Sequence, residues 1–323
     1  MSLILRNKTI FASDTRERVL SVARKLKYRP NLLVKGMQSG KTYTVGVIMP
    51  MVTAYRSEIL TGIHNELVAA DHIPFIVWPN PKAKQPYRFT ELEQIHRLVD
   101  RRVDGVILFP QEDQAPDDYL HEVWERKIPL VSVDREMEAT HADFVGVDDS
   151  AGARMVAEHL LSLGHTNFGY LSGIPSTTTT FRHRLESFKS AVSQKTGSTL
   201  VIAETDYVKV KIKPVLELLK SVSRPTAIFA ANDYLAIAVL RAAEMLGLKV
   251  PEDISVVGFG DLDVCVWVSP RLTSVQQFPR LIGREAAKLI LKRSFDSLER
   301  VEPRKIRIRP KLVIRESTAR VSK

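Results

Sequence analysis

Short apolar runs alternate with longer amphipathic segments over most of the chain. The apolar runs cover residues 45–49, 73–78, 105–109, 129–133, 168–171, 199–203, 227–230 and 254–257. The segments between them, with apolar residues at helical spacing, cover 56–70, 89–102, 117–127, 150–163, 181–194, 212–221 and 233–246. Continuous apolar runs that alternate with helices are typical of parallel strands buried on both faces. The pattern predicts an α/β fold with two doubly wound parallel sheets in series.

Two such sheets place a ligand cleft between them, because the carboxyl ends of the strands in each open sheet face a crevice. Before the first sheet, Ser13 or Asp14 is the expected N-cap of a short helix that ends at Tyr28-Arg29-Pro30. Its apolar stripe consists of Val19, Leu20, Val22, Ala23 and Leu26. The segment that follows is too short for a stable isolated helix, so we predict a linker that orders only on binding.

Positive charge is concentrated at the N-terminus. The first 41 residues hold ten Lys and Arg against two acids, a net charge of +8 out of +10, which leaves +2 on the remaining 282 residues. A short basic head on a nearly neutral body is the form expected of a nucleic-acid-binding arm. The first hypothesis is therefore a DNA-binding regulator.

Composition narrows the class of protein further. The single cysteine, Cys265, excludes an internal disulfide framework and is expected to be buried and inert. The sequence contains no signal-peptide h-region and no apolar run near the roughly 20 residues of a membrane span, so we expect a cytoplasmic protein without membrane contact. Motifs for a nucleophile elbow, a zinc protease or a phosphate-binding loop are lacking, so we expect neither an enzyme nor a cofactor or metal.

Several stretches, in their order and spacing, resemble the LacI/GalR-type bacterial transcriptional regulators over essentially the whole chain. They are Thr15–Leu20, Tyr28–Asn31, Val145–Asp149 running into Glu158–His165, Pro225–Asp233, Val250–Phe259 and Leu312–Ser317. Each stretch is weak by itself, and the combination is specific.

The resemblance implies a domain organisation. Residues 1–30 would be the remnant of a helix-turn-helix head, 31–42 a hinge, and 43–323 an effector-binding domain. That domain would have an N-lobe of about 43–163 and 277–306 and a C-lobe of about 164–276 and 307–320. Because Ile4-Leu5-Arg6-Asn7 resembles the exit of the recognition helix, about twenty residues of the motif are expected to be missing. The alternative is a family member with a naturally shortened head.

In the hinge, Met37 matches the position of an apolar wedge that family members insert into the minor groove. Lys35 would contact phosphate and Asn31 a groove edge. The alternative is an exposed linker of basic character.

In the cleft, the resemblance implies effector contacts from both lobes. Arg184 matches the family's bidentate arginine, suited to hydroxyls, carboxylate or phosphate. Each of the other polar candidates has an alternative role. Asn232 and Asp233 open a helix; we favour the cap for Asp233, whereas cap and ligand contact are equally open for Asn232. Asp149 or Ser150 would also serve as an N-cap. Gln277 and Trp267, on the segment that links the lobes, would bond or stack on the ligand, and the alternative for Trp267 is packing or an interface.

Two departures from the family pattern bear on the effector. Gly260, followed by Asp261, replaces the aspartate usual in members that bind neutral sugars. Tyr55-Arg56-Ser57-Glu58 stands where many relatives have an aromatic residue at the start of the first N-lobe helix, so Arg56 would point into the cleft. Two arginines and a missing carboxylate predict an anionic effector, such as a sugar acid or sugar phosphate. The alternative for Arg56 is a solvated face where it pairs with an acid.

The resemblance implies a homodimer that binds a small-molecule effector and a double-stranded DNA operator. Cleft closure and operator binding would be coupled. A periplasmic-type solute-binding protein shares the two-lobed architecture and is the alternative. It has no use for a basic head.

Overall fold

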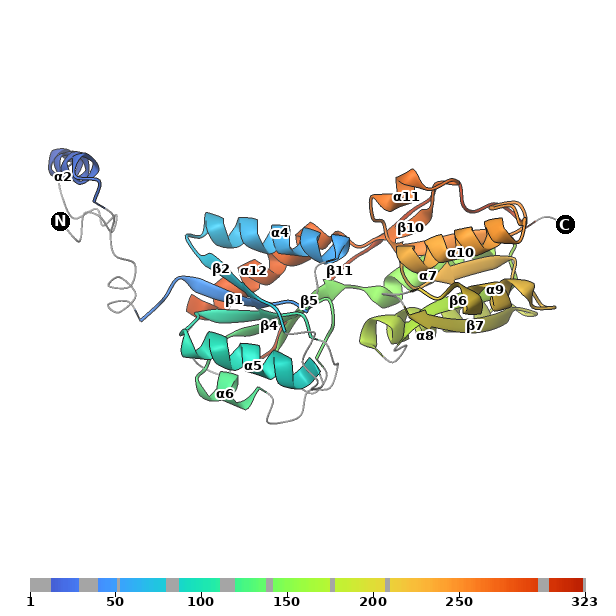
Figure 1. Cartoon of the computed structure of the whole chain (residues 1–323), viewed down its shortest axis with the longest axis horizontal. Coiled ribbons are helices and arrows are strands. Elements are labelled where there is room, and N and C mark those ends of the chain that lie inside the picture. The colour runs from blue at the N-terminus through green and yellow to red at the C-terminus, as the bar shows by residue number, and fades with distance from the viewer. Residues whose placement is uncertain are drawn as a thin grey trace.

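A computed structural model gives the structure of residues 13–28, 40–50, 53–79, 87–110, 120–137, 142–174, 178–206, 210–295 and 302–321. Figure 1 shows two α/β lobes side by side, with helix α2 (Ser13–Lys25) apart from both. Each lobe contains one six-stranded sheet. The predicted fold class is confirmed.

The first lobe, the N-lobe, has an entirely parallel sheet in the order β11-β5-β4-β3-β1-β2. Its strands are β1 (Thr44–Ile48), β2 (Ile73–Val77), β3 (Gly105–Leu108), β4 (Leu130–Val133), β5 (Asp143–Val147) and β11 (Lys305–Ile308). Helices α4 (Ala54–Ala69) and α12 (Pro279–Phe295) cover one face, and α5 (Tyr87–Asp100) and α6 (His121–Glu125) cover the other (Figure 1). Strands β3, β4 and β5 are buried along their whole length, which explains their continuous apolar sequence.

The second lobe, the C-lobe, has the strand order β12-β10-β9-β8-β6-β7, with β12 antiparallel to β10. Its strands are β6 (Asn167–Ile174), β7 (Thr199–Asp206), β8 (Ala227–Ala230), β9 (Ser255–Gly260), β10 (Thr273–Gln276) and β12 (Lys311–Val313). Its helices are α7 (Asp149–Ser162), α8 (Thr179–Ser193), α9 (Ile212–Lys220), α10 (Asp233–Met245) and α11 (Val264–Trp267).

An aromatic cluster fills the C-lobe core and leads toward the cleft. The rings of Phe188 and Phe229 lie 5.1 Å apart, and Phe229 lies 6.2 Å from Phe259. All three side chains are almost completely buried. Phe259 lies near the end of β9, so the outermost ring of the cluster supports the floor of the cleft.

The described chain passes between the lobes three times, at residue 148, at 277–278 and at 309–310. The predicted lobe boundaries near 163 and 306 therefore differ from the structure. Helix α7 belongs to the C-lobe, where Gly152 faces the side chains of Phe259 and Val275. Strand β11 keeps residues as far as Ile308 in the N-lobe.

Helices α4 and α12 cross at a pair of glycines. A Cβ on Gly62 would collide with the carbonyl oxygen of Arg280, and one on Gly283 with that of Ile59. Glycine at both positions allows the two backbones to touch, so α12 is held directly against α4.

Most predicted elements are confirmed within a few residues, with three differences. Helix α6 is shorter than the predicted 117–127, although residues 111–119 lie outside the described part of the chain. The elements after β9, namely α11, α12 and strands β10, β11 and β12, were not predicted. The apolar stripe of α2 is only partly covered, since Ala23 is buried while Leu26 is 71% exposed.

We expect Gly283→Ala to lower the free energy of unfolding by about 1–3 kcal/mol, because its methyl group would overpack the crossing. Alanine at an unhindered helical glycine would instead stabilise the protein by up to about 1 kcal/mol, so the sign of the change shows whether the methyl group overpacks the crossing. Urea-induced unfolding gives both values. Arg284→Ala, on the exposed part of the same helix, is the control and should change the free energy by less than about 0.5 kcal/mol.

Candidate functional site

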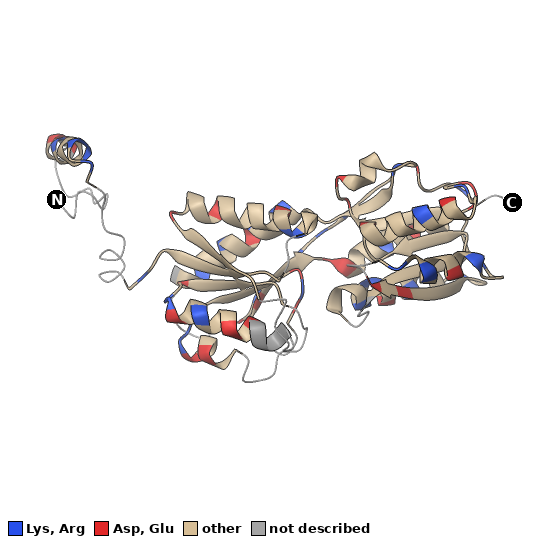
Figure 2. Cartoon of the chain, viewed as in Figure 1, with Lys and Arg blue, Asp and Glu red and all other residues tan. Residues whose placement is uncertain are grey.

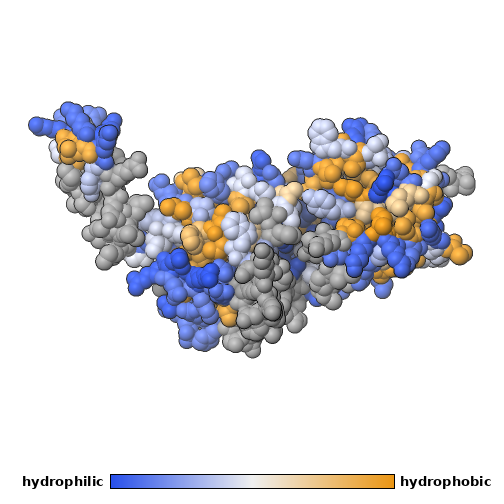
Figure 3. All heavy atoms as spheres, viewed as in Figure 1, coloured by the Kyte–Doolittle hydropathy of each residue, from blue (hydrophilic) through white to orange (hydrophobic). Residues whose placement is uncertain are grey.

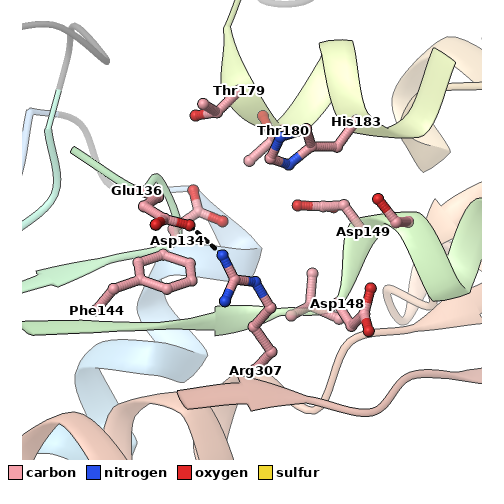
Figure 4. Close-up of a pocket in the computed structure, with 11 residues that line it drawn as sticks. Asp134, Glu136, Phe144, Asp148, Asp149, Thr179, Thr180, His183 and Arg307 are labelled. Carbon is pink, nitrogen blue, oxygen red and sulfur yellow. Dashed lines mark hydrogen bonds and ion pairs between the residues drawn. The ribbon is translucent and has the colours of Figure 1, made fainter. Parts of the chain in front are cut away.

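A polar cavity of about 190 Å³ lies between the lobes, at the carboxyl ends of the strands (Figure 4). The N-lobe contributes Asp134, Glu136, Phe144, Val147 and Arg307 to its lining. Asp148 comes from the first connection, and the C-lobe contributes Asp149, Ser150, Thr179, Thr180 and His183. The predicted cleft therefore contains a cavity to which both sheets supply side chains.

Arg184 lies beside this cavity in the second turn of α8 and is 4% exposed. Its Nε donates to Asp149 Oδ1 at 2.6 Å, and its Nη1 donates to the carbonyl oxygen of Ala231 at 2.6 Å. Its Nη2 donates to Gln277 Oε1 at 3.4 Å. The guanidinium carbon lies 3.7 Å from the centroid of the Phe259 ring. Three acceptors and one aromatic face thus fix the orientation of this cation.

Asp149 begins α7 and places its carboxylate between Arg184 and the cavity. Burial raises the pKa of Asp149 to about 6, while the charge of Arg184 and its hydrogen bond act in the opposite direction. The N-cap of α7 is Asp148, whose Oδ1 accepts from the Ala151 amide at 2.8 Å. The alternative that Asp149 or Ser150 caps this helix is therefore wrong, and both side chains line the cavity.

Tyr55 and Asp134 face each other at the N-lobe side of the cleft. The buried Tyr55 hydroxyl makes no close hydrogen bond within the described chain, although the Asp134 carboxylate lies near enough to interact with it. Burial raises the pKa of this hydroxyl well above its ordinary value, and the Asp134 charge adds to the effect. A buried hydroxyl beside a carboxylate is ready to donate to a ligand oxygen that also reaches Asp134.

Glu136 pairs with two basic side chains of β11. Its carboxylate pairs with Lys305 Nζ at 2.6 Å and with the Arg307 guanidinium, an ion pair visible in Figure 4. Arg307 also lies over Phe144, with its guanidinium carbon 5.5 Å from the ring centroid. One carboxylate thus pairs with two cations and offsets one of the two positive charges on this wall.

Carboxylates dominate the lining. Four of its residues, Asp134, Glu136, Asp148 and Asp149, are acids, while its basic side chains are Arg307 and His183. Hydroxyl groups can donate to carboxylates and accept from guanidinium or imidazole groups. The cavity thus has the chemistry to bind an uncharged molecule rich in hydroxyl groups.

The structure decides between cap and ligand contact for Asn232 and Asp233. Asn232 is the N-cap of α10, since its Oδ1 accepts from the Leu235 amide at 2.9 Å. Asp233 is wholly buried and accepts from Ser274 Oγ at 2.5 Å and from the Leu262 amide at 2.9 Å. The expectation that Asp233 is the cap is therefore wrong.

The same carboxylate explains why residue 260 is a glycine. Gly260 has φ +148°, and a Cβ there would meet Asp233 Oδ2 at 2.5 Å. The space beside Gly260 is thus filled by Asp233, which belongs to another element. The glycine reflects this packing, and it leaves a buried carboxylate near the place where the family pattern has one.

Three other predicted contacts lie outside the cavity lining. Asp261 pairs with Arg315 at 2.6 Å, and Trp267 is 84% exposed on α11, so packing does not account for that side chain. Arg56 is half-buried in the first turn of α4, with its amide bound to Thr53 Oγ1. The structure therefore brings together Arg184, Asp149 and Gln277, with Tyr55 and Ser150 nearby, and it separates Asp261 and Trp267 from them.

Sequence reasoning missed most of the cavity wall. Asp134 directly follows β4, a position where a polar side chain signals a crevice residue, and this signal was available. Glu136, Phe144, His183 and Arg307 carried no such signal, because their place depends on how the lobes meet. The predicted hinge residues Asn31, Lys35 and Met37 lie outside the described residues.

The described residues also bear on metal binding and membrane contact. They contain no group of three or more His, Cys, Asp or Glu side chains placed to hold a metal ion. None of the helices in the described ranges has the length and apolar character needed to cross a membrane. Cys265 is buried, as expected.

Comparisons with known proteins agree with this architecture. Residues 157–318 match the family model described as a periplasmic binding protein-like domain. The HTH-type transcriptional regulator DegA of Bacillus subtilis is 29% identical over 99% of this chain and 94% of its own. A LacI family transcriptional regulator from Enterococcus faecium, crystallised with bound ribose, is 27% identical with a TM-score of 0.73, over 86% of this chain and 100% of its own. A CelR–cellobiose complex is 25% identical with a TM-score of 0.74, over 98% of this chain and 94% of its own.

The raised pKa of Asp149 predicts a pH dependence of stability. Because the pKa is about 6 in the folded protein and 3.8 ordinarily, the stability that Asp149 contributes is complete below pH 4 and is lost as the pH rises through 6. Between pH 7 and pH 5, the wild type should gain about 1 kcal/mol relative to Asp149→Asn. Urea unfolding of both proteins at the two pH values measures this difference, and equal pH profiles would contradict it.

Proposed function

Because the chain belongs to the LacI/GalR family of transcriptional regulators built on a periplasmic-binding-protein-like domain, we propose that it is a repressor controlled by a small carbohydrate in the cleft between its lobes. The observation that carries this proposal is the cavity that both lobes line with hydrogen-bonding side chains. The basic N-terminal segment supplies the charge for binding operator DNA. Binding to DNA implies that the protein acts in the cytoplasm.

The effector is an uncharged sugar or a similar polyhydroxylated molecule. Its hydroxyl groups would donate to Asp134 and Asp149 and accept from Tyr55 and His183. The ribose and cellobiose bound by two structural neighbours belong to this chemical class. The role of such a ligand is to bridge the lobes and so favour the closed arrangement.

The predicted anionic effector has less support. Arg184 already pairs with Asp149, and Arg307 with Glu136, so an anion would compete with a carboxylate at each cation. Repulsion by the other acids of the lining adds to this cost. Arg56 is not part of the lining and supplies no compensating charge there.

A solute-binding protein without a DNA-binding role is the second candidate, since it shares the two-lobed fold. The charge distribution favours the regulator. Acidic and basic residues are interleaved along the helices and strands of both lobes (Figure 2), whereas the excess of +8 lies within the first 41 residues. Binding of duplex DNA by the full chain, weakened by added salt, separates the two functions.

A homodimer would carry two such heads, and exposed apolar side chains indicate where the copies meet. In the N-lobe, Ile73 and Phe75 lie on the edge strand β2 and are 55% and 38% exposed. In the C-lobe, Val266 and Trp267 on α11 are 47% and 84% exposed. Figure 1 places α4, α10 and α11 along one long side, and Figure 3 shows hydrophobic surface on both lobes. A second copy along this side would cover both sets.

A thermal-shift measurement tests the class of effector. We expect D-ribose or cellobiose at 100 times its Kd to raise the melting temperature by about 5 °C or more, because a ligand that binds only the folded state stabilises it by mass action. D-Gluconate and ribose 5-phosphate should have no effect. A shift with the two anions alone would restore the anionic effector and contradict the neutral one. Asp149→Asn should weaken sugar binding by about 10- to 100-fold, and Val222→Ala, at a fully exposed site outside the cavity lining, is the control.

Light scattering tests the dimer. The wild type should have twice the mass of one chain at micromolar concentration, and Phe75→Glu with Val266→Glu should give a monomer, because buried charge is costly at an interface. Val222→Glu, at a fully exposed site elsewhere on the C-lobe, should remain dimeric. A dimer that survives the double substitution would show that the copies meet elsewhere.

A further inference from the structure

Hydrogen bonds hold residues 41–43, the segment that joins the linker to β1, against the N-lobe. Thr42 and Tyr43 donate their amides to the two carboxylate oxygens of Asp104, at 2.9 and 2.6 Å. Thr42 Oγ1 donates to the carbonyl oxygen of Arg102 at 2.9 Å. Lys41 Nζ donates to the carbonyl oxygen of Ser294 at 2.8 Å. We call these four hydrogen bonds the linker clamp.

Asp104 binds this segment through both its side chain and its backbone. It lies in the turn between α5 and β3, and its own amide donates to the Thr44 carbonyl at 2.8 Å. The Asp104 carboxylate thus binds two successive amides, while the Asp104 backbone binds β1, the strand that follows the linker. Bonds from amides to a carboxylate are stronger than bonds between neutral groups.

Lys41 reaches the last turn of α12, on the other side of the linker. That turn is itself anchored, because Arg293 donates to both carboxylate oxygens of Asp143 on β5 at 2.8 Å. The crossing at Gly62 and Gly283 holds α12 against α4 farther along. Lys41 therefore binds a helix end that is fixed to the body of the N-lobe.

The other end of the same helix lies at the cleft. Gln277, which accepts from Arg184, is two residues before α12 begins at Pro279. A helix of 17 residues spans about 25 Å, so α12 runs from the cleft to the clamp within one lobe. Any rotation of the N-lobe that follows ligand binding moves the clamp with it.

We propose that Asp104 and Lys41 are the positioning residues that make the linker move as one body with the N-lobe, and so couple the effector to DNA binding. This inference rests on the proposed function. Without the clamp, the lobe would still rotate on ligand binding, but the chain leading to the DNA-binding head would no longer follow it. Neither residue touches the effector or DNA in this role.

Hydrogen–deuterium exchange of the full chain, without ligand or DNA, tests the clamp itself. In Asp104→Ala, the amides of Thr42 and Tyr43 should exchange at least about tenfold faster, while β1 stays protected. Asp253→Ala, which removes a matched carboxylate from the Lys249 amide in the C-lobe, should leave Thr42 and Tyr43 unchanged. Unchanged exchange at these two amides in Asp104→Ala would overturn the proposal.

The coupling is measured as the ratio of DNA affinities with and without sugar. The DNA is a duplex selected from a randomised pool by the wild-type chain with a complete helix-turn-helix head joined ahead of it, and the sugar is D-ribose or cellobiose, whichever raises the melting temperature. We expect a wild-type ratio of about fivefold or more, and a ratio near one in Asp104→Asn and Lys41→Met with the sugar affinity unchanged. Lys41→Arg, which keeps a donor, should restore the ratio.

Variants that keep the wild-type ratio would overturn the proposal. A wild-type chain that selects no duplex would instead contradict the proposed regulator, and the two failures are therefore distinct.

Discussion

One buried cation holds the junction between the lobes together. Arg184 binds Asp149, the first residue after one connection between the lobes, and Gln277, which lies within another. A guanidinium buried to this extent must be paired, and truncating one partner would leave an uncompensated charge in an apolar setting. The aromatic cluster ending at Phe259 fixes the cation from below. The shape of the cleft thus depends on a charge that the protein itself neutralises.

This neutralisation changes how the cleft is interpreted. In the sequence, Arg184 and Arg56 suggest a binding site for an anion, because isolated arginines read as available positive charge. In the structure, Arg184 and Arg307 are each satisfied by a carboxylate, and further carboxylates remain around the cavity. A ligand in this cavity would therefore meet hydrogen-bond acceptors and donors in place of free positive charge.

Much of the architecture is predictable from the sequence because it depends on local periodicity. The buried strands β3 and β8 and the helices between them follow from apolar runs and helical spacing alone. Helix α12 was not predicted, and its role depends on contacts with α4, a distant segment. The caps Asp148 and Asn232 each differ by one residue from an adjacent acid that does other work. Only tertiary packing distinguishes the members of each pair, as it does for Gly260 and Asp233.

The interleaving of the lobes along the chain has a consequence for synthesis on the ribosome. The N-lobe sheet needs β11, and the C-lobe sheet needs β12, which lies only a few residues later. The first lobe to be translated therefore waits, incomplete, until nearly all of the second has emerged. During that interval the basic N-terminal segment is already outside the ribosome, while the cleft that would govern it has yet to form. Both lobes are completed only with these last strands, so every newly made chain exposes its basic segment for a time before the cleft exists.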